Sequence, residues 1–121
     1  MGTNLIKLAA VYLVVGLFMG MYMSMAEDHT LKSVHTHINL LGWATLAIMG
    51  IIYKLYPQLE NTVLANIHFW LHNVGLPVMM ISLAFYLSTG NNEFVIGISS
   101  GSTLVVIGVV LYVINLFKLK T

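Results

Sequence analysis

The sequence contains no cysteine and very little charge: five lysines and four acidic residues serve all 121 positions, and arginine is absent. Without cysteine, the chain can form no disulfide, no thiolate zinc site, no iron-sulfur cluster and no thiolate-ligated heme. Five dispersed lysines and a net charge of +1 give no basic surface, which excludes a nucleic acid as the partner. Any metal chemistry must therefore come from imidazole, and the chain has five histidines.

In place of charged residues, the chain has long apolar stretches. Its residues are 59% hydrophobic and 7% charged, whereas about 25% are charged in an ordinary soluble domain. Four stretches reach the length of about 20 residues that a helix needs to cross a bilayer: approximately residues 5–25, 30–56, 62–87 and 94–119. Short loops force successive helices to alternate in direction, so we expect an all-α membrane protein, an antiparallel four-transmembrane-helix bundle in which residues 1–121 form a single domain.

The lysines predict how this bundle is oriented. Four of them fall at one end of the expected helices: Lys7, Lys54, Lys118 and Lys120. Because Lys32 alone falls at the other end, the positive-inside rule places both termini in the cytoplasm of an integral membrane protein, which we assign to a bacterial inner membrane. The first stretch also has features of a signal peptide, but we favour a spanning helix because its apolar part is long for a signal.

Four of the five histidines lie inside apolar stretches, where ionisable side chains are costly and usually functional. His35 and His37 are two residues apart, so on a helix that turns about 100° per residue they point toward opposite sides and cannot chelate one ion. They could serve two different sites that flank the helix, or one could ligate while the other bonds a backbone carbonyl or a heme propionate. His68 and His72 are four residues apart, project from one face and could share a metal ion.

Polar neighbours allow two interpretations of these histidines. Thr36, Asn39 and Asn73 are candidates to hydrogen-bond the second ring nitrogen of a ligating imidazole. Alternatively, the histidines and these neighbours only hydrogen-bond across helices and hold the bundle together. The last stretch has no ionisable residue before Lys118 and is expected to be a packing helix.

Methionines recur at alternate positions of the first stretch: Met19, Met21, Met23 and Met25. Thioethers suit copper(I), so this run could contribute to a copper site. Alternate residues spread over the faces of a helix, however, which favours methionine as an apolar filler.

One set of residues in the second stretch follows a familiar pattern: His35, Thr36, Gly42, Trp43, Gly50, Tyr53 and Pro57. This set resembles the second transmembrane helix of the large subunit of heme-copper oxidases and nitric oxide reductases, which in that family supplies a histidine to the low-spin heme. The His-x-His of His35 and His37 is also similar to the family's tenth helix, where the two histidines bind two hemes. The segment 66–77 is similar to the family's third helix.

The resemblance implies heme b bound through His35 and His37. It also implies a homotrimer, because the family's twelve helices form three groups of four and this chain resembles one group. Two pairs of glycines would supply smooth faces for contacts between chains: Gly16 with Gly20, and Gly97 with Gly101. The copper-binding histidine pair, the cross-linked tyrosine and the propionate-binding arginines of the family have no equivalent here, so we do not expect a complete oxygen-reducing centre.

These residues are compatible with three functions. The first is a membrane heme protein that transfers electrons to or from an unknown redox partner, or that binds or senses a diatomic gas. If this protein turned over a substrate, it would be an oxidoreductase resembling the heme-copper oxidases. The second is a copper or zinc binding or transport protein that uses His68 and His72, and the third is a non-catalytic structural or assembly protein.

Overall fold

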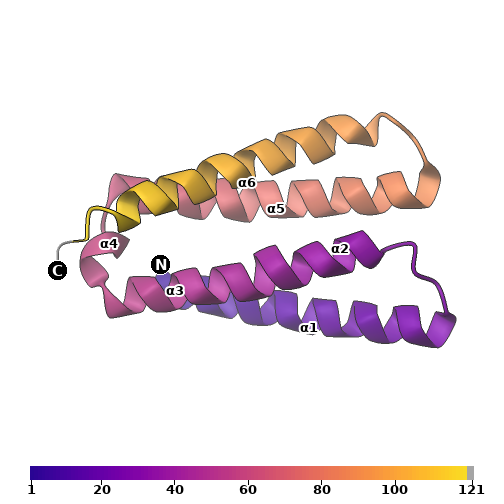
Figure 1. The fold of residues 1–121 in the computed structure, drawn as a ribbon, viewed down its shortest axis with the longest axis horizontal. Helices are drawn as coiled ribbons and strands as arrows, with labels where there is room; N and C mark the ends of the chain where they lie inside the picture. Colours follow the sequence, from indigo (N-terminus) through magenta and orange to yellow (C-terminus); the bar gives the residue numbers. More distant parts are fainter. Residues whose placement is uncertain (120–121) are drawn as a thin grey trace.

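Figure 1 shows the fold in a computed structural model, which describes residues 1–119. Lys120, which the orientation argument counts with the other terminal lysines, lies outside the described residues. Throughout residues 1–119 the chain is helical between short turns and contains no β-strand. The elements in chain order are α1 (Gly2–Ala26), α2 (Lys32–His37), the π-helix η1 (Ile38–Ala44), α3 (Thr45–Leu55), α4 (Pro57–Glu60), α5 (Val63–Thr89) and α6 (Phe94–Leu116).

Four helical stretches of the described chain are long and apolar enough to cross a membrane: Gly2–Ala26, Lys32–Leu55, Val63–Thr89 and Phe94–Leu116. The second of them is α2, η1 and α3 joined end to end. This result confirms the expectation of an all-α protein with four candidate spanning helices. In Figure 1 successive stretches run in opposite directions, and the start of α1 lies at the same end as α4 and the end of α6.

The helices begin and end for local reasons. Glu27 closes α1 in the left-handed conformation, at φ 52°. The second span stops at Leu55, because Pro57 disfavours a helical conformation for the residue before it. The side chain of Thr62 accepts a backbone N–H in the first turn of α5, and Gly90, at φ 71°, ends that helix as glycine commonly does.

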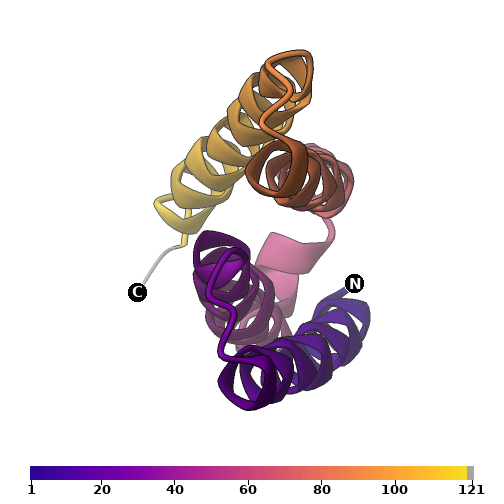
Figure 2. The same ribbon diagram turned by 90° about the vertical axis from the view of Figure 1, so that its right-hand side faces the viewer.

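The four spans form two helical hairpins, which Figure 2 shows end-on as two pairs. In the first hairpin α1 packs against η1 and α3, and in the second α5 packs against α6. A Cβ added to Gly101 would lie 2.5 Å from the backbone nitrogen of Met79, and one added to Gly75 would lie 2.8 Å from the carbonyl oxygen of Gly101. Backbone therefore lies directly against backbone between α5 and α6, as small residues allow in membrane helices.

The glycine pairs that the sequence argument assigned to contacts between chains are used inside the chain. Gly20 faces the ring of His35, and Gly16 faces the side chain of Asn39. In α6, Gly97 and Gly101 both face α5. These four glycines pack the two hairpins internally, so they leave no smooth glycine face for a neighbouring chain.

Two apolar clusters connect the hairpins. One combines buried side chains of α1, α3, α4, α5 and α6: Leu5, Ala9, Leu46, Met49, Tyr53, Leu59, Ala65 and Tyr112. The other joins α2 and η1 to the second hairpin: Val34, Ile38, Leu76, Met79, Met80 and Val105. The segment that carries His35 and His37 is therefore packed on both hairpins, and its position is fixed by apolar contacts on each side.

Candidate functional site

The second span changes from α-helix to π-helix directly after His37. The hydroxyl of Thr45 donates a hydrogen bond to the carbonyl of Leu40, five residues earlier, at 2.7 Å. Within the same stretch the carbonyl of Leu41 accepts a hydrogen bond from Nε2 of His72, at 3.1 Å. Short π-helical stretches are frequent at functional sites. This one directly follows His37 in the chain and contacts His72 through the carbonyl of Leu41.

His37 lies at the edge of a groove between the second span and the second hairpin. Its Nδ1 lies 2.8 Å from the carbonyl oxygen of Ser33, so Nδ1 carries the proton and donates it. Nε2 makes no hydrogen bond with the described residues and keeps its lone pair free. The groove has a volume of about 370 Å³, is open on one side and is lined by His37, Leu41, Met79, Ser102, Val105, Val106, Val109 and Val110.

His35 faces the other way, into its own hairpin. A Cβ on Gly20 of α1 would lie 3.0 Å from its Cε1 atom, so the ring fills the space that this glycine leaves. Its Nε2 lies 3.3 Å from the side-chain nitrogen of Asn39, while Nδ1 is buried without a hydrogen-bond partner in the described chain. The two rings therefore lie on different sides of one helix, and of these two only His37 lines the groove.

The three predicted polar neighbours, Thr36, Asn39 and Asn73, have different hydrogen-bond partners. Asn39 lies beside His35, as just described. The hydroxyl of Thr36 donates instead to the carbonyl of Lys32, at 2.9 Å, and the amide of Asn73 donates to the carbonyl of Phe69, at 2.8 Å. Both bonds return to the residue's own helix, so the structure places neither group on an imidazole.

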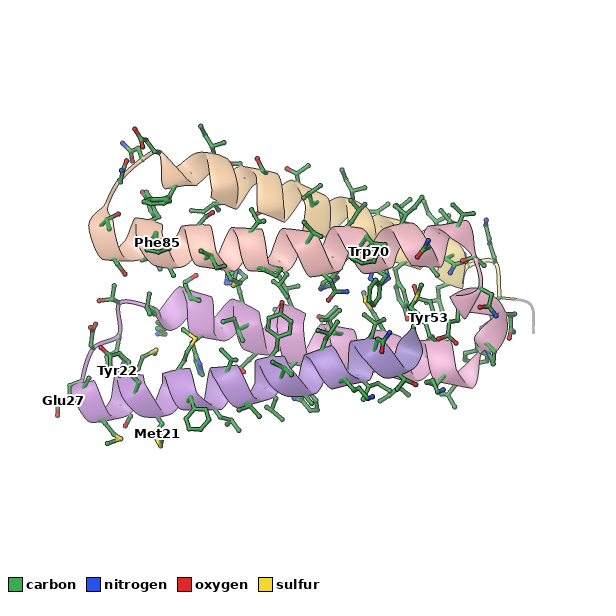
Figure 3. All side chains as sticks on the ribbon, turned by 180° about the vertical axis from the view of Figure 1, so that it is seen from behind. Met21, Tyr22, Glu27, Tyr53, Trp70 and Phe85 are labelled. Carbon is green, nitrogen blue, oxygen red and sulfur yellow. The ribbon has the colours of Figure 1, made fainter. Side chains whose placement is uncertain are left out.

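His68 and His72 are fully buried and lie side by side. Their ring centroids are 5.5 Å apart and the ring planes are perpendicular. Nδ1 of His68 lies 3.0 Å from the hydroxyl of Tyr53, which Figure 3 labels between the two hairpins. Nε2 of His68 and Nδ1 of His72 have no hydrogen-bond partner within residues 1–119. Each ring thus has one nitrogen held by the protein and one left open.

Three further polar residues join this buried pair, and the sequence argument did not assign them to a site. Tyr53 from α3 and Tyr112 from α6 lie against His68, with ring centroids 6.0 and 5.1 Å from it. Asn115 from α6 is also buried and donates to the carbonyl of Leu59, at 2.9 Å. The last helix therefore contributes polar groups as well as packing. A signal was present, because Tyr112 and Asn115 are three residues apart and share one helix face.

The described residues contain no group of three or more His, Cys, Asp or Glu side chains that could hold a metal ion. The methionines of α1 do not converge either: Met23 is buried, whereas Met21 and Met25 are exposed, and Met21 points outward in Figure 3. Any metal site in this part of the chain must combine imidazole with other donors.

Comparisons with known proteins give one partial match. The chain is similar to the Cbb3-type cytochrome c oxidase subunit CcoN1 of Stutzerimonas stutzeri, at 33% identity over 55 residues. The matched part is 40% of this chain but 12% of that subunit, so the chain corresponds to a small fraction of its relative. This match is compatible with a distant relationship to the heme-copper oxidases. No family model and no solved structure matches the chain.

Proposed function

We propose that this protein is a membrane heme protein in which His37 binds the heme iron. The observation that carries the proposal is the position of His37, which presents an unprotonated Nε2 at the edge of an apolar groove. Imidazole is a common ligand of iron. The groove volume of about 370 Å³ falls within the range of about 300–1,000 Å³ that is typical of small-molecule sites.

The imidazole of His37 would suit the heme iron, and the apolar lining of the groove would suit the edge of the heme ring. The carbonyl of Ser33 fixes the tautomer and orientation of the imidazole by accepting its Nδ1 proton, which is the usual support of a metal-binding histidine. Val105, Val106 and Val109 provide an apolar wall. A bound heme b would supply an iron that exchanges one electron or binds a diatomic gas. The protein would hold it through the imidazole of His37 and the apolar lining of the groove.

His35 has a different place in this proposal from the one that the family resemblance implies. Its ring packs on Gly20 inside the first hairpin, on the far side of the helix from the groove. One chain therefore offers one imidazole to one groove. With one imidazole from the chain, a bound heme would be free to bind a gas, or it would take a second ligand from another copy and suit electron transfer.

A homotrimer is part of the proposal, because the groove is open on one side. Val106 and Val110 at its edge are 60% and 50% exposed, and a second copy would cover them. Closed three-fold symmetry repeats such a contact without leaving a free edge. The distribution of Lys7, Lys54 and Lys118 supports cytoplasmic termini in a bacterial inner membrane.

The decisive experiment compares two single variants expressed with a supply of heme. We expect wild type to purify with a Soret band and about one heme per chain, His37→Ala to lose at least nine tenths of that heme, and His35→Ala to keep most of it. His29→Ala, in the exposed loop after α1, is the matched control and should bind as wild type does. Full heme content in His37→Ala would overturn the proposal.

Two further measurements determine how many protein ligands the heme has and how many chains form the particle. A carbon monoxide difference spectrum of the reduced protein shows an open axial position, and its absence from a heme-loaded protein indicates two protein ligands. The detergent-corrected mass gives the number of chains. A monomer with its full heme content would contradict the trimer while leaving heme binding intact.

A further inference from the structure

The buried cluster around His68 has no role in the heme proposal. Five buried side-chain atoms in the described chain lack a hydrogen-bond partner, and one of them belongs to His35. The other four come from residues of α5 and α6 in the cluster just described: His68 Nε2, His72 Nδ1, Tyr112 Oη and Asn115 Oδ1. Unpaired polar atoms are strongly unfavourable inside an apolar bundle, so their concentration here points to a bound species.

The hydrogen bonds fix which nitrogen atoms are available. A carbonyl only accepts, so Nε2 of His72 must carry the proton that it gives to Leu41, and Nδ1 of His72 must present a lone pair. In His68 the Tyr53 hydroxyl can accept the Nδ1 proton, and in that tautomer Nε2 also presents a lone pair. One nitrogen tied to a protein oxygen and the other free is the arrangement of histidines that bind metal ions.

The geometry permits one ion between the two rings. Nitrogen–zinc bonds of imidazole are about 2.0–2.1 Å long, so two rings that share one ion have centroids at most about 6.5 Å apart. The observed separation of 5.5 Å lies within this reach. We propose that His68 and His72 bind one transition-metal ion inside the bundle.

The charge of the donors indicates which ion fits best. Copper and zinc both accept imidazole, but the two histidines are neutral and no acidic residue lies within α5 or α6. The penalty for an uncompensated charge in an apolar medium grows with the square of that charge. A monovalent ion is therefore favoured over a divalent one, and copper(I) should bind more tightly than zinc(II).

The test uses the full chain without heme, in detergent, in a parent variant that carries His29→Gln and His37→Gln. These changes remove the imidazole of the exposed loop and the one that lines the groove; His35, packed on Gly20, remains. The parent is loaded with copper(I) under reducing conditions, or with zinc(II), and the metal that survives gel filtration is counted by mass spectrometry. We expect about one copper(I) per chain and at least tenfold weaker binding of zinc(II).

Adding His68→Gln and His72→Gln should reduce bound copper below about a tenth of an equivalent. Glutamine keeps an amide that can donate to Leu41, which favours folding of the variant. Copper retained in full by the combined variant would overturn the site, and tighter binding of zinc(II) would overturn the assignment to copper(I).

A second measurement does not depend on the folding of those variants. An ion bound at a buried site of the native state raises the melting temperature of the parent protein in proportion to the logarithm of its excess over Kd. An unchanged melting temperature, together with no retained metal in the parent, would overturn the proposal. Because heme uptake is measured on the wild type through His37, either proposal can fail without the other.

Discussion

The two histidine pairs use the same side chain in neighbouring spans and end in different surroundings. His35 and His37 lie on opposite sides of one helix, each half-buried and each with its own partners. His68 and His72 share one face, are fully buried and lie 5.5 Å apart between ring centroids. Spacing along the helix decides whether two rings can act together; the covering helices decide whether they meet lipid, a groove or the interior.

The covering helix explains the difference in burial. Gly75 and Gly101 bring the backbones of α5 and α6 into contact, so that α6 lies over one side of the His68 and His72 face. The second span has a close partner in α1, where Gly20 receives His35, but a groove remains between His37 and α6. The buried pair should therefore matter most for stability, and the His37 side most for binding.

The largest expected effect is the loss of protein stability when the buried pair is disrupted. Replacement of His68 by alanine leaves a cavity and removes the partner of the Tyr53 hydroxyl, so we expect a loss of about 3 kcal/mol in the free energy of unfolding. His37→Ala in heme-free protein should cost less than about 1 kcal/mol, because that side chain is half-buried at a groove. Denaturant titration in micelles measures both, and equal losses would contradict the comparison.

The next effect tests the contact that buries the pair. In Gly101→Ala the new Cβ meets backbone atoms of Met79 and Gly75 at 2.5–2.8 Å, so α5 and α6 must separate. We expect a loss of about 2 kcal/mol. Gly97→Ala is the matched control in the same helix, since its Cβ meets only the side chain of Ser82. If Gly97→Ala costs as much as Gly101→Ala, backbone contact is not what holds this hairpin together.

A smaller effect tests the hydrogen bond within the cluster. Tyr53→Phe removes the hydroxyl that lies 3.0 Å from Nδ1 of His68 and leaves the ring in place, so we expect about 1 kcal/mol of destabilisation. Tyr56→Phe is the control, because Tyr56 is 41% exposed. The same titration applies, and an unchanged midpoint in Tyr53→Phe would show that this bond adds nothing to stability.

The smallest effect concerns a polar contact outside the spanning helices. The carboxylate of Glu60 accepts hydrogen bonds from the amino group of Met1, at 2.8 Å, and the N–H of Gly2, at 2.7 Å, which lowers its pKa below the ordinary value of 4.5. A lowered carboxyl pKa means that the folded state binds its proton less readily than the unfolded state. The contribution is therefore complete above about pH 4.5 and is lost as the pH falls through the folded-state pKa.

We expect the contribution of Glu60 to be at most about 1 kcal/mol, since the contact is partly exposed. Unfolding of wild type and Glu60→Gln should differ at neutral pH and converge in acid. A constant gap between wild type and Glu60→Gln would contradict the assigned pKa shift.

Much of the architecture could be predicted from short-range features of the sequence. The lengths of the apolar stretches predict four spanning helices, and Pro57 and Gly90 mark where two of them end. Helical rotation predicts that His35 and His37 diverge and that His68 and His72 share a face. These properties depend on residues within one or two turns of each other.

Other features depend on residues that are distant in the sequence. Tyr53 meets His68 across 15 residues, Leu41 meets His72 across 31, and Asn115 reaches Leu59 across 56. No local pattern specifies such pairs, because they follow from how two hairpins pack. For the same reason the spacing of the glycine pairs alone predicts contacts between chains, whereas the structure uses these glycines within this chain.

The sequence by itself determined a helical membrane protein whose only nitrogen ligands for a metal are histidines, since composition and a 3.6-residue period suffice for that. Only the tertiary structure decided which histidine lines a groove, which is packed on glycine and which two are buried with Tyr53 and Tyr112. The physical reason is that a helix fixes the direction of a side chain relative to its own axis, whereas the neighbour it meets depends on how closely other helices can approach.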